Sequence, residues 1–242
     1  ADKMDPADST PVSWGLNSQL VKDADGTIRE RVWKVGGMYS PAIEKIVFWL
    51  EKAAEVAHGQ QKATIEALID YYKSGDLKQF DAFNVLWVQD TASKVDFVNG
   101  FTENYGDPLG YRGSWEGLVN FRDEDATLRT KTISEEAQWF EDHSPIDDQF
   151  RKKEVKGVSA KVITAAMLGG DSYPSTAIGI NLPNADWIRR DHGSKSVTIQ
   201  NITSAYSEAA KGNGFAEEFV LDPAVIELRQ KYGTLGDDLH TD

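Results

Sequence analysis

The chain has 242 residues, of which 40% are hydrophobic and 27% charged, so it holds enough apolar material for one or two buried cores. Lys and Arg number 26 against 39 Asp and Glu, and the resulting net charge of −13 disfavours nucleic acid as a partner. The lack of cysteine excludes disulfides, thiolate metal ligands and a cysteine nucleophile. The sequence has no run of about 18 apolar residues, so no membrane-spanning helix is expected.

The first third of the chain is predicted to contain a β region followed by three helices. Residues 1–40 are predicted to be β structure, because Asp25-Gly26 is a turn dipeptide between short apolar stretches. The first helix is expected from Ser40, an N-cap followed by Pro41, to about Gly59, since apolar residues recur there at spacings of three and four. Two further helices are expected over residues 61–73, ended by Ser74-Gly75, and 77–86.

The middle of the chain is predicted to contain strands and charged helical segments. Residues 87–90 are compatible with a strand or with a helix end. An aromatic run over residues 96–105 is broken by Gly106-Asp107-Pro108, and residues 112–119 alternate as in a strand. Charged segments compatible with helices follow over residues 123–140 and 146–155.

The last third of the chain is predicted to contain one strand and two helices. Residues 177–182 are a short apolar run between two prolines, which is typical of a buried or ligand-facing strand. One helix is expected over residues 197–210 with Ser196 as its cap. Another is expected over about 223–231, between Asp222 as N-cap and Gly233 as its end.

The histidines do not have the spacing of a helical zinc site. Such a site needs two His within a turn of each other with a Glu beside one of them, and His58, His143, His192 and His240 meet neither condition. No G-x-S-x-G nucleophile motif occurs. The glycines around Asn213 lack the Lys-Ser/Thr of a phosphate loop and are interpreted as a turn.

Glu103 and Tyr105 form a candidate binding pair. On a strand, residues two apart face the same way. A phenol beside a carboxylate can donate to a developing oxyanion while the carboxylate binds an ammonium group. Such a pair is more often structural, and Asn181 and Asn184 around Pro183 are first interpreted as turn formers. The residues by themselves leave both interpretations open.

Four longer strings together resemble the dipeptidyl peptidase III family of zinc exopeptidases, peptidase family M49. Residues from Tyr39 into the 50s resemble the family's helix after its N-terminal β region, and residues 87–90 match W-I/V-Q-D. Residues 100–117 resemble G-F-x-E-x-Y-x-D-P-x-G-x-R-G-x-x-E-G, and residues 178–186 resemble G-I-N-I/L-P-N-x-D. The resemblance covers most of residues 30–242.

The resemblance implies roles for residues inside the matching strings. Tyr105 corresponds to the family's tyrosine that stabilises the oxyanion, and Glu103 to the glutamate that binds the substrate's N-terminal ammonium. Asn181 and Asn184 correspond to the asparagines that hold the first residues of the peptide. The strand beginning at Ile178 corresponds to the one that pairs edge-on with the peptide. The implied substrate-binding residues are Glu103, Asn104, Ile178, Gly179, Asn181 and Asn184.

The family's zinc helix, with its His-Glu-x-x-x-His motif, is not found in this sequence. In the family that helix follows soon after the region resembling residues 232–242. We therefore expect a fragment that ends just before the zinc motif, is inactive by itself and belongs to an enzyme that carries zinc. The implied partners are short peptides with a free N-terminus and the remaining part of the same enzyme.

The family pattern implies an α+β fold with two lobes, mostly helical, with a small β-barrel-like sheet in the substrate-binding lobe and an incomplete helical zinc lobe. The substrate-binding lobe is expected to comprise residues 1–123 and 165–204, and the zinc lobe residues 124–164 and 205–242. A cytoplasmic location is expected, or an exported one where a signal has been removed.

Two other interpretations remain. The chain is alternatively a non-catalytic peptide-binding module that lacks the metal lobe. A glycan-binding surface rests only on the seven Trp residues, which core packing explains more simply.

Overall fold

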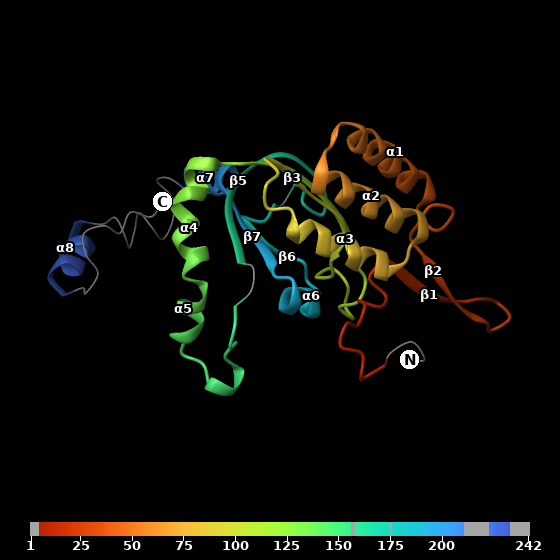
Figure 1. The fold of residues 1–242 in the computed structure, drawn as a ribbon, viewed down its shortest axis with the longest axis horizontal. Helices are drawn as coiled ribbons and strands as arrows, with labels where there is room; N and C mark the ends of the chain where they lie inside the picture. The colour runs from red at the N-terminus through yellow and green to blue at the C-terminus, as the bar shows by residue number, and fades with distance from the viewer. Residues whose placement is uncertain (1–4, 156–157, 175, 211–222, 233–242) are drawn as a thin grey trace. The chain divides into compact units, whose positions relative to one another are not determined.

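The structure is a computed structural model that describes residues 5–155, 158–174, 176–210 and 223–232. It divides into two compact units, Ala1–Gln200 and Asn201–Asp242. The first unit combines helices with a sheet, which confirms the α+β class (Figure 1). The division into lobes stays a prediction, and one of its boundaries, between residues 164 and 165, falls inside a strand.

The N-terminal hairpin and the three helices after it confirm the predictions for the first third of the chain. Strands β1 (Ser18–Lys22) and β2 (Ile28–Val32) pair antiparallel around the Asp25-Gly26 turn. Helix α1 (Ser40–Val56) has Pro41 in its first turn, but its N-cap is Tyr39 rather than Ser40. Helices α2 and α3 cover Gly59–Ser74 and Leu77–Gln89.

Helix α3 extends three residues beyond its predicted end at Leu86, so residues 87–90 are a helix end. Trp87 and Val88 are buried in this last turn. The Trp87 indole N–H donates to the carbonyl of Phe97 at 2.8 Å, which ties the helix end to the sheet. Burial of these two side chains stabilises the extra helical turn. The local sequence does not show that these residues are buried, so it did not predict the longer helix.

The central sheet has five strands in the order β3-β4-β5-β7-β6. Neighbouring strands are antiparallel except β5 and β7, which are parallel. The sheet is open, with β3 and β6 at its two edges, so the expectation of a barrel-like sheet is wrong for the described residues. The strands are β3 (Val95–Glu103), β4 (Ser114–Arg122), β5 (Val158–Gly170), β6 (Gly179–Leu182) and β7 (Ser194–Ile199).

Two of these strands correct the predictions. No element was predicted for residues 158–170, which form β5. Residues 197–199 were expected to begin a helix, but they end β7, because they pair with β5. Helix α7 (Gln200–Ala210) begins only after that strand. Within the predicted segment 146–155 only the 3-10 turn Asp148–Phe150 is helical.

All but one of the remaining helices agree with the predicted segments; the exception is the short helix after β6, which was not predicted. Helices α4 (Glu124–Glu135) and α5 (Ala137–Asp142) occupy the charged segment 123–140, and α4 packs on β5. The short α6 (Asp186–Asp191) follows β6, and α8 (Pro223–Tyr232) confirms the last predicted helix. Its expected cap Asp222, its expected end Gly233 and the turn at Asn213 lie outside the described residues. None of the helices in the described ranges could cross a lipid bilayer.

Aromatic side chains join α2 and α3 to strands β3 and β4. The Tyr72 hydroxyl donates to Asn99 at 2.6 Å and accepts from the Trp115 indole at 2.9 Å. A Cβ atom at Gly100 would lie 3.1 Å from the Phe80 ring, so the lack of a side chain there lets α3 approach the sheet. This close packing holds one face of α3 beside the end of β3.

Candidate functional site

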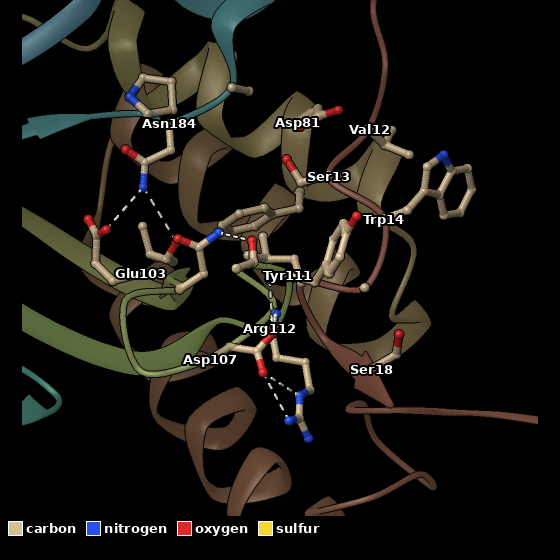
Figure 2. Close-up of a pocket in the computed structure, with 18 of the residues that line it drawn as sticks. Val12, Ser13, Trp14, Ser18, Asp81, Glu103, Asp107, Tyr111, Arg112 and Asn184 are labelled. Carbon is tan, nitrogen blue, oxygen red and sulfur yellow. Dashed lines mark hydrogen bonds and ion pairs between the residues drawn. The ribbon is translucent and has the colours of Figure 1, made fainter. Parts of the chain in front are cut away.

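A cavity with a volume of about 1280 Å³ lies within the first unit. Figure 2 shows that it lies between the N-terminal segment, helix α3, the loop after β3 and the segment after β6. Its wall includes the aromatic side chains of Trp14, Phe80, Phe83 and Trp87. This volume is above the roughly 300–1,000 Å³ of typical small-molecule pockets, and the wall combines apolar with polar side chains, as in ligand-binding sites.

Four of the residues implied by the family resemblance line this pocket: Glu103, Asn104, Tyr105 and Asn184. Glu103 is the last residue of β3, and Tyr105 lies two residues into the following loop with 90% of its surface exposed. The Asn184 side chain comes from the segment after β6 and donates to the Glu103 carboxylate at 3.3 Å and to the Thr102 carbonyl at 3.4 Å (Figure 2). The fold thus brings together two strings 81 residues apart.

The other three implied residues, Ile178, Gly179 and Asn181, do not line the pocket and belong to the β6 region. Ile178 and Asn181 are exposed. A Cβ atom at Gly179 would lie 2.9 Å from the Val197 carbonyl oxygen, so glycine permits the pairing with β7. In the described ranges no strand pairs with the other side of β6. That edge can accept an extended peptide by main-chain hydrogen bonds.

The Glu103 carboxylate lies near a second, buried carboxyl group, that of Glu116 on β4. Burial, and then the charge of Glu103, raise the pKa of Glu116 to about 7. The Ser172 hydroxyl donates to Glu116 at 3.2 Å and opposes this rise. Because two neighbouring carboxylates repel each other, a cation beside Glu103 is favoured at neutral pH.

Asp81 on α3 is a pocket residue that the sequence analysis missed. Its side chain is only 8% exposed. Burial raises its pKa to about 7. The spacing in the sequence could have identified it, because Asp81 and Asn84 lie on the same buried helix face as Leu77 and Val88. A polar residue on such a face indicates a cavity or a buried polar contact.

We expect Asp81→Asn to stabilise the chain at pH 8 but not at pH 4. The pKa of Asp81 is about 7 in the folded chain and 3.8 ordinarily, so the folded state holds this proton more tightly. The wild-type chain therefore loses stability as the pH rises from about 4 to about 7, whereas the variant does not lose this contribution. The free energy of unfolding of the variant should exceed that of the wild type by about 1–3 kcal/mol at pH 8 and by less than about 0.5 kcal/mol at pH 4.

Urea unfolding at both pH values measures this difference. Asp70→Asn on the exposed side of α2 is the matched control and should change stability by less than about 0.5 kcal/mol at either pH. Equal stability of Asp81→Asn and the wild-type chain at pH 8 would show that the Asp81 carboxylate is not penalised by burial.

The zinc ion that the family implies does not fit the residues of the described part of the chain. Within that part, no three His, Cys, Asp or Glu side chains are grouped so that they could hold a metal ion. His143 stacks on Trp139 at 4.2 Å between ring centroids, and His58 occupies the N-cap position of α2 without a side-chain capping hydrogen bond. We derive no chemical step through a metal from these residues.

Comparison with known proteins gives a family match and several relatives. The family model of peptidase family M49 matches residues 17–230. Dipeptidyl peptidase 3 of Rattus norvegicus is 28% identical over 184 residues, which are 75% of this chain and 24% of that protein. Dipeptidyl peptidase 3 of Dictyostelium discoideum is 30% identical over 175 residues, with 71% of this chain and 24% of that protein covered. The chain therefore spans about a quarter of the length of these relatives.

Solved structures share the fold. The dipeptidyl-peptidase III structure from Corallococcus sp. strain EGB superposes with a TM-score of 0.69 at 24% identity, over 79% of this chain and 35% of that one. DPP III from Caldithrix abyssi gives a TM-score of 0.70 at 21% identity, over 81% of this chain and 37% of that one.

Proposed function

Because this chain belongs to peptidase family M49, we propose that it is the substrate-binding part of a zinc-dependent exopeptidase that releases dipeptides from the N-terminus of short peptides. We call the polypeptide that would carry both this chain and the zinc site the complete enzyme. The observation that carries the proposal is the convergence of Glu103, Tyr105 and Asn184 on one pocket.

In the proposed complex the peptide's N-terminal ammonium pairs with the Glu103 carboxylate. Asn184 already donates to that carboxylate and holds it toward the pocket. The nearby Glu116, with a pKa of about 7, is partly ionised near neutral pH, and its charge adds to that of Glu103 in favouring a cation. A fixed ammonium site sets the register of the peptide, so cleavage falls at a constant distance from its N-terminus.

The peptide main chain pairs in this proposal with the outer edge of β6, along Ile178, Gly179 and Asn181. Main-chain pairing gives affinity with little selectivity for side chains. Asn104 follows Glu103 in the chain and also lines the pocket. Tyr105 is the proposed catalytic residue, because its hydroxyl can donate a hydrogen bond to the oxyanion that forms when the peptide carbonyl is attacked.

We expect this chain to bind short peptides that have a free N-terminus. Calorimetry with a tetrapeptide should give a dissociation constant of about 1 mM or lower. The same peptide with an acetylated N-terminus should bind at least about tenfold more weakly, because it lacks the charged donor for Glu103.

The variant Glu103→Gln should remove this preference, since a neutral amide does not distinguish a charged N-terminus. Glu154→Gln, outside the residues that line the pocket, is the matched control and should keep it. Equal affinities of the free and acetylated peptides for the wild-type chain would refute an ammonium site at Glu103.

A further inference from the structure

The loop between β3 and β4 is closed by its own side chains. It runs from Asn104 to Gly113, and the strand residues on either side, Glu103 and Ser114, pair with each other. The Asn104 amide donates to the Gly110 carbonyl across the loop. Gly110 has a φ of 67°, which suits glycine, and its N–H donates to the Asp107 carbonyl at 2.9 Å.

The Asp107 carboxylate is the centre of this arrangement. One of its oxygens accepts from the backbone N–H groups of Tyr111 at 2.9 Å and Arg112 at 3.1 Å. The other oxygen accepts from the Arg112 guanidinium at 3.0 Å and 3.3 Å, as Figure 2 shows. The Asp107 side chain is only 5% exposed, although it lies in a surface loop. The N–H of Tyr111, followed by that of Arg112 and its guanidinium, holds the pKa of Asp107 below its ordinary value.

The loop is also attached to the N-terminal segment that forms the opposite wall of the pocket. The N–H of Gly113 donates to the Leu16 carbonyl at 2.7 Å. A Cβ atom at Gly15 would lie 3.4 Å from the Tyr111 side chain, so these two segments are in contact. Arg112 and Tyr111 themselves line the pocket. The loop from Asp107 onward is therefore held by the Asp107 carboxylate at its start and by the N-terminal segment at its end.

Glu103 and Tyr105, the two residues with proposed functions, are held in place by different parts of the structure. Glu103 belongs to β3 and is held by pairing with β4. Tyr105 lies outside the strand, and its ring is 90% exposed, so packing of the ring contributes little to its position. Its backbone lies between Asn104 and Asp107, whose main-chain groups are joined by a 3.1 Å hydrogen bond. We propose that Asp107 is the positioning residue that keeps the loop segment with Tyr105 at the pocket, through its hydrogen bonds to Tyr111 and Arg112, which we call the Asp107 clamp.

This inference rests on the proposed function of Tyr105 and predicts a specific kinetic pattern. Opening the clamp should displace the oxyanion donor on the loop but not the ammonium site on the strand. In the complete enzyme, Asp107→Ala should lower kcat about 10-fold to 100-fold and leave KM within about twofold. A general loss of folded structure would instead alter binding and turnover together.

Two variants complete the kinetic test. Asp107→Asn retains an oxygen that accepts from the two backbone N–H groups and should recover most of the lost kcat. Asp148→Ala breaks another Asp–Arg ion pair, of 2.7 Å to Arg151, away from the residues that line the pocket, and should leave kcat unchanged.

Hydrogen exchange of this chain reports on the loop without depending on activity. The amides of Tyr111 and Arg112 should exchange much faster in Asp107→Ala than in the wild-type chain, while those of β3 should not. Unchanged exchange in the loop, or faster exchange with an unchanged kcat, would overturn the proposal. A fall in peptide affinity as large as that of Glu103→Gln would also overturn it. A wild-type enzyme that releases no dipeptide would instead refute the proposed function, and the exchange result would still show whether Asp107 closes the loop.

Discussion

Replacing Tyr105 by Phe in the complete enzyme is expected to lower kcat about 100-fold or more and to leave KM within about twofold. The proposed hydroxyl donates a hydrogen bond to charge that develops only in the transition state, and loss of one such donor typically costs this much. The ring is 90% exposed and its hydroxyl has no hydrogen bond that would hold the fold together in the described residues, so removal of one oxygen should not disturb folding.

Steady-state kinetics on a short peptide with a free N-terminus measure this effect. Tyr173→Phe, at a residue that is 68% exposed and outside the pocket wall, is the matched control and should retain the wild-type kcat. Calorimetry on the 242-residue chain should give the same peptide affinity with Tyr105 or its Phe replacement. A near wild-type kcat in Tyr105→Phe would remove this residue from the mechanism.

The largest expected loss of stability follows removal of Asp96, which pairs with a buried lysine. The Lys195 ammonium lies 2.7 Å from the Asp96 carboxylate and 4.2 Å from the centre of the Trp87 ring, and the Lys195 side chain is only 1% exposed. A second buried lysine, Lys161, donates to the Thr91 carbonyl at 3.2 Å. Burial, and then the charge of Lys195, lower the pKa of Lys161. The Asp96 carboxylate thus compensates positive charge in a poorly solvated region.

We expect Asp96→Ala to lower the free energy of unfolding by about 3–5 kcal/mol, because it leaves a buried ammonium without its counter-charge. Asp96→Asn should cost less, since its amide oxygen can still accept from the Trp87 indole, which donates to Asp96 at 3.0 Å. The double variant Asp96→Ala, Lys195→Met should regain much of the loss, because it removes the uncompensated charge.

Urea unfolding of the wild-type chain and the three variants measures these differences. The double-mutant comparison separates the pairing energy from the cost of each single change. A loss of less than about 1 kcal/mol in Asp96→Ala would mean that water or another group solvates Lys195.

The elements that the sequence predicted correctly are those with local signals. The β1–β2 turn needs only Asp25-Gly26, and α2 ends at Gly75, whose φ of 71° suits the residue that follows a helix. The spacing of apolar residues in α1 predicts one buried helix face, and Ile43 and Val47 on that face are buried in the structure. Each signal acts within a few residues of the element it specifies, so it can be read without the rest of the fold.

The strands β5 and β7 were missed because charged side chains occupy buried positions in them. Lys161 in β5 and Lys195 in β7 are buried, which interrupts the apolar alternation that identifies a strand. The two strands pair in parallel across a long connection. Lys195 is stabilised by Asp96 and Trp87, and Lys161 by the Thr91 carbonyl, and these partners are far from the lysines in sequence.

The sequence by itself determined the family, the helices with local signals and the candidate residues Glu103, Tyr105 and Asn184, because each of these depends on a short contiguous segment. Only the tertiary structure decided that Glu103, Tyr105 and Asn184 line one pocket, that Asp81 lies in its wall and that β6 pairs with β7 on its inner side. The physical reason is that proximity and burial come from the packing of α3 and the strand order of the open sheet. Both depend on contacts between residues far apart in the chain.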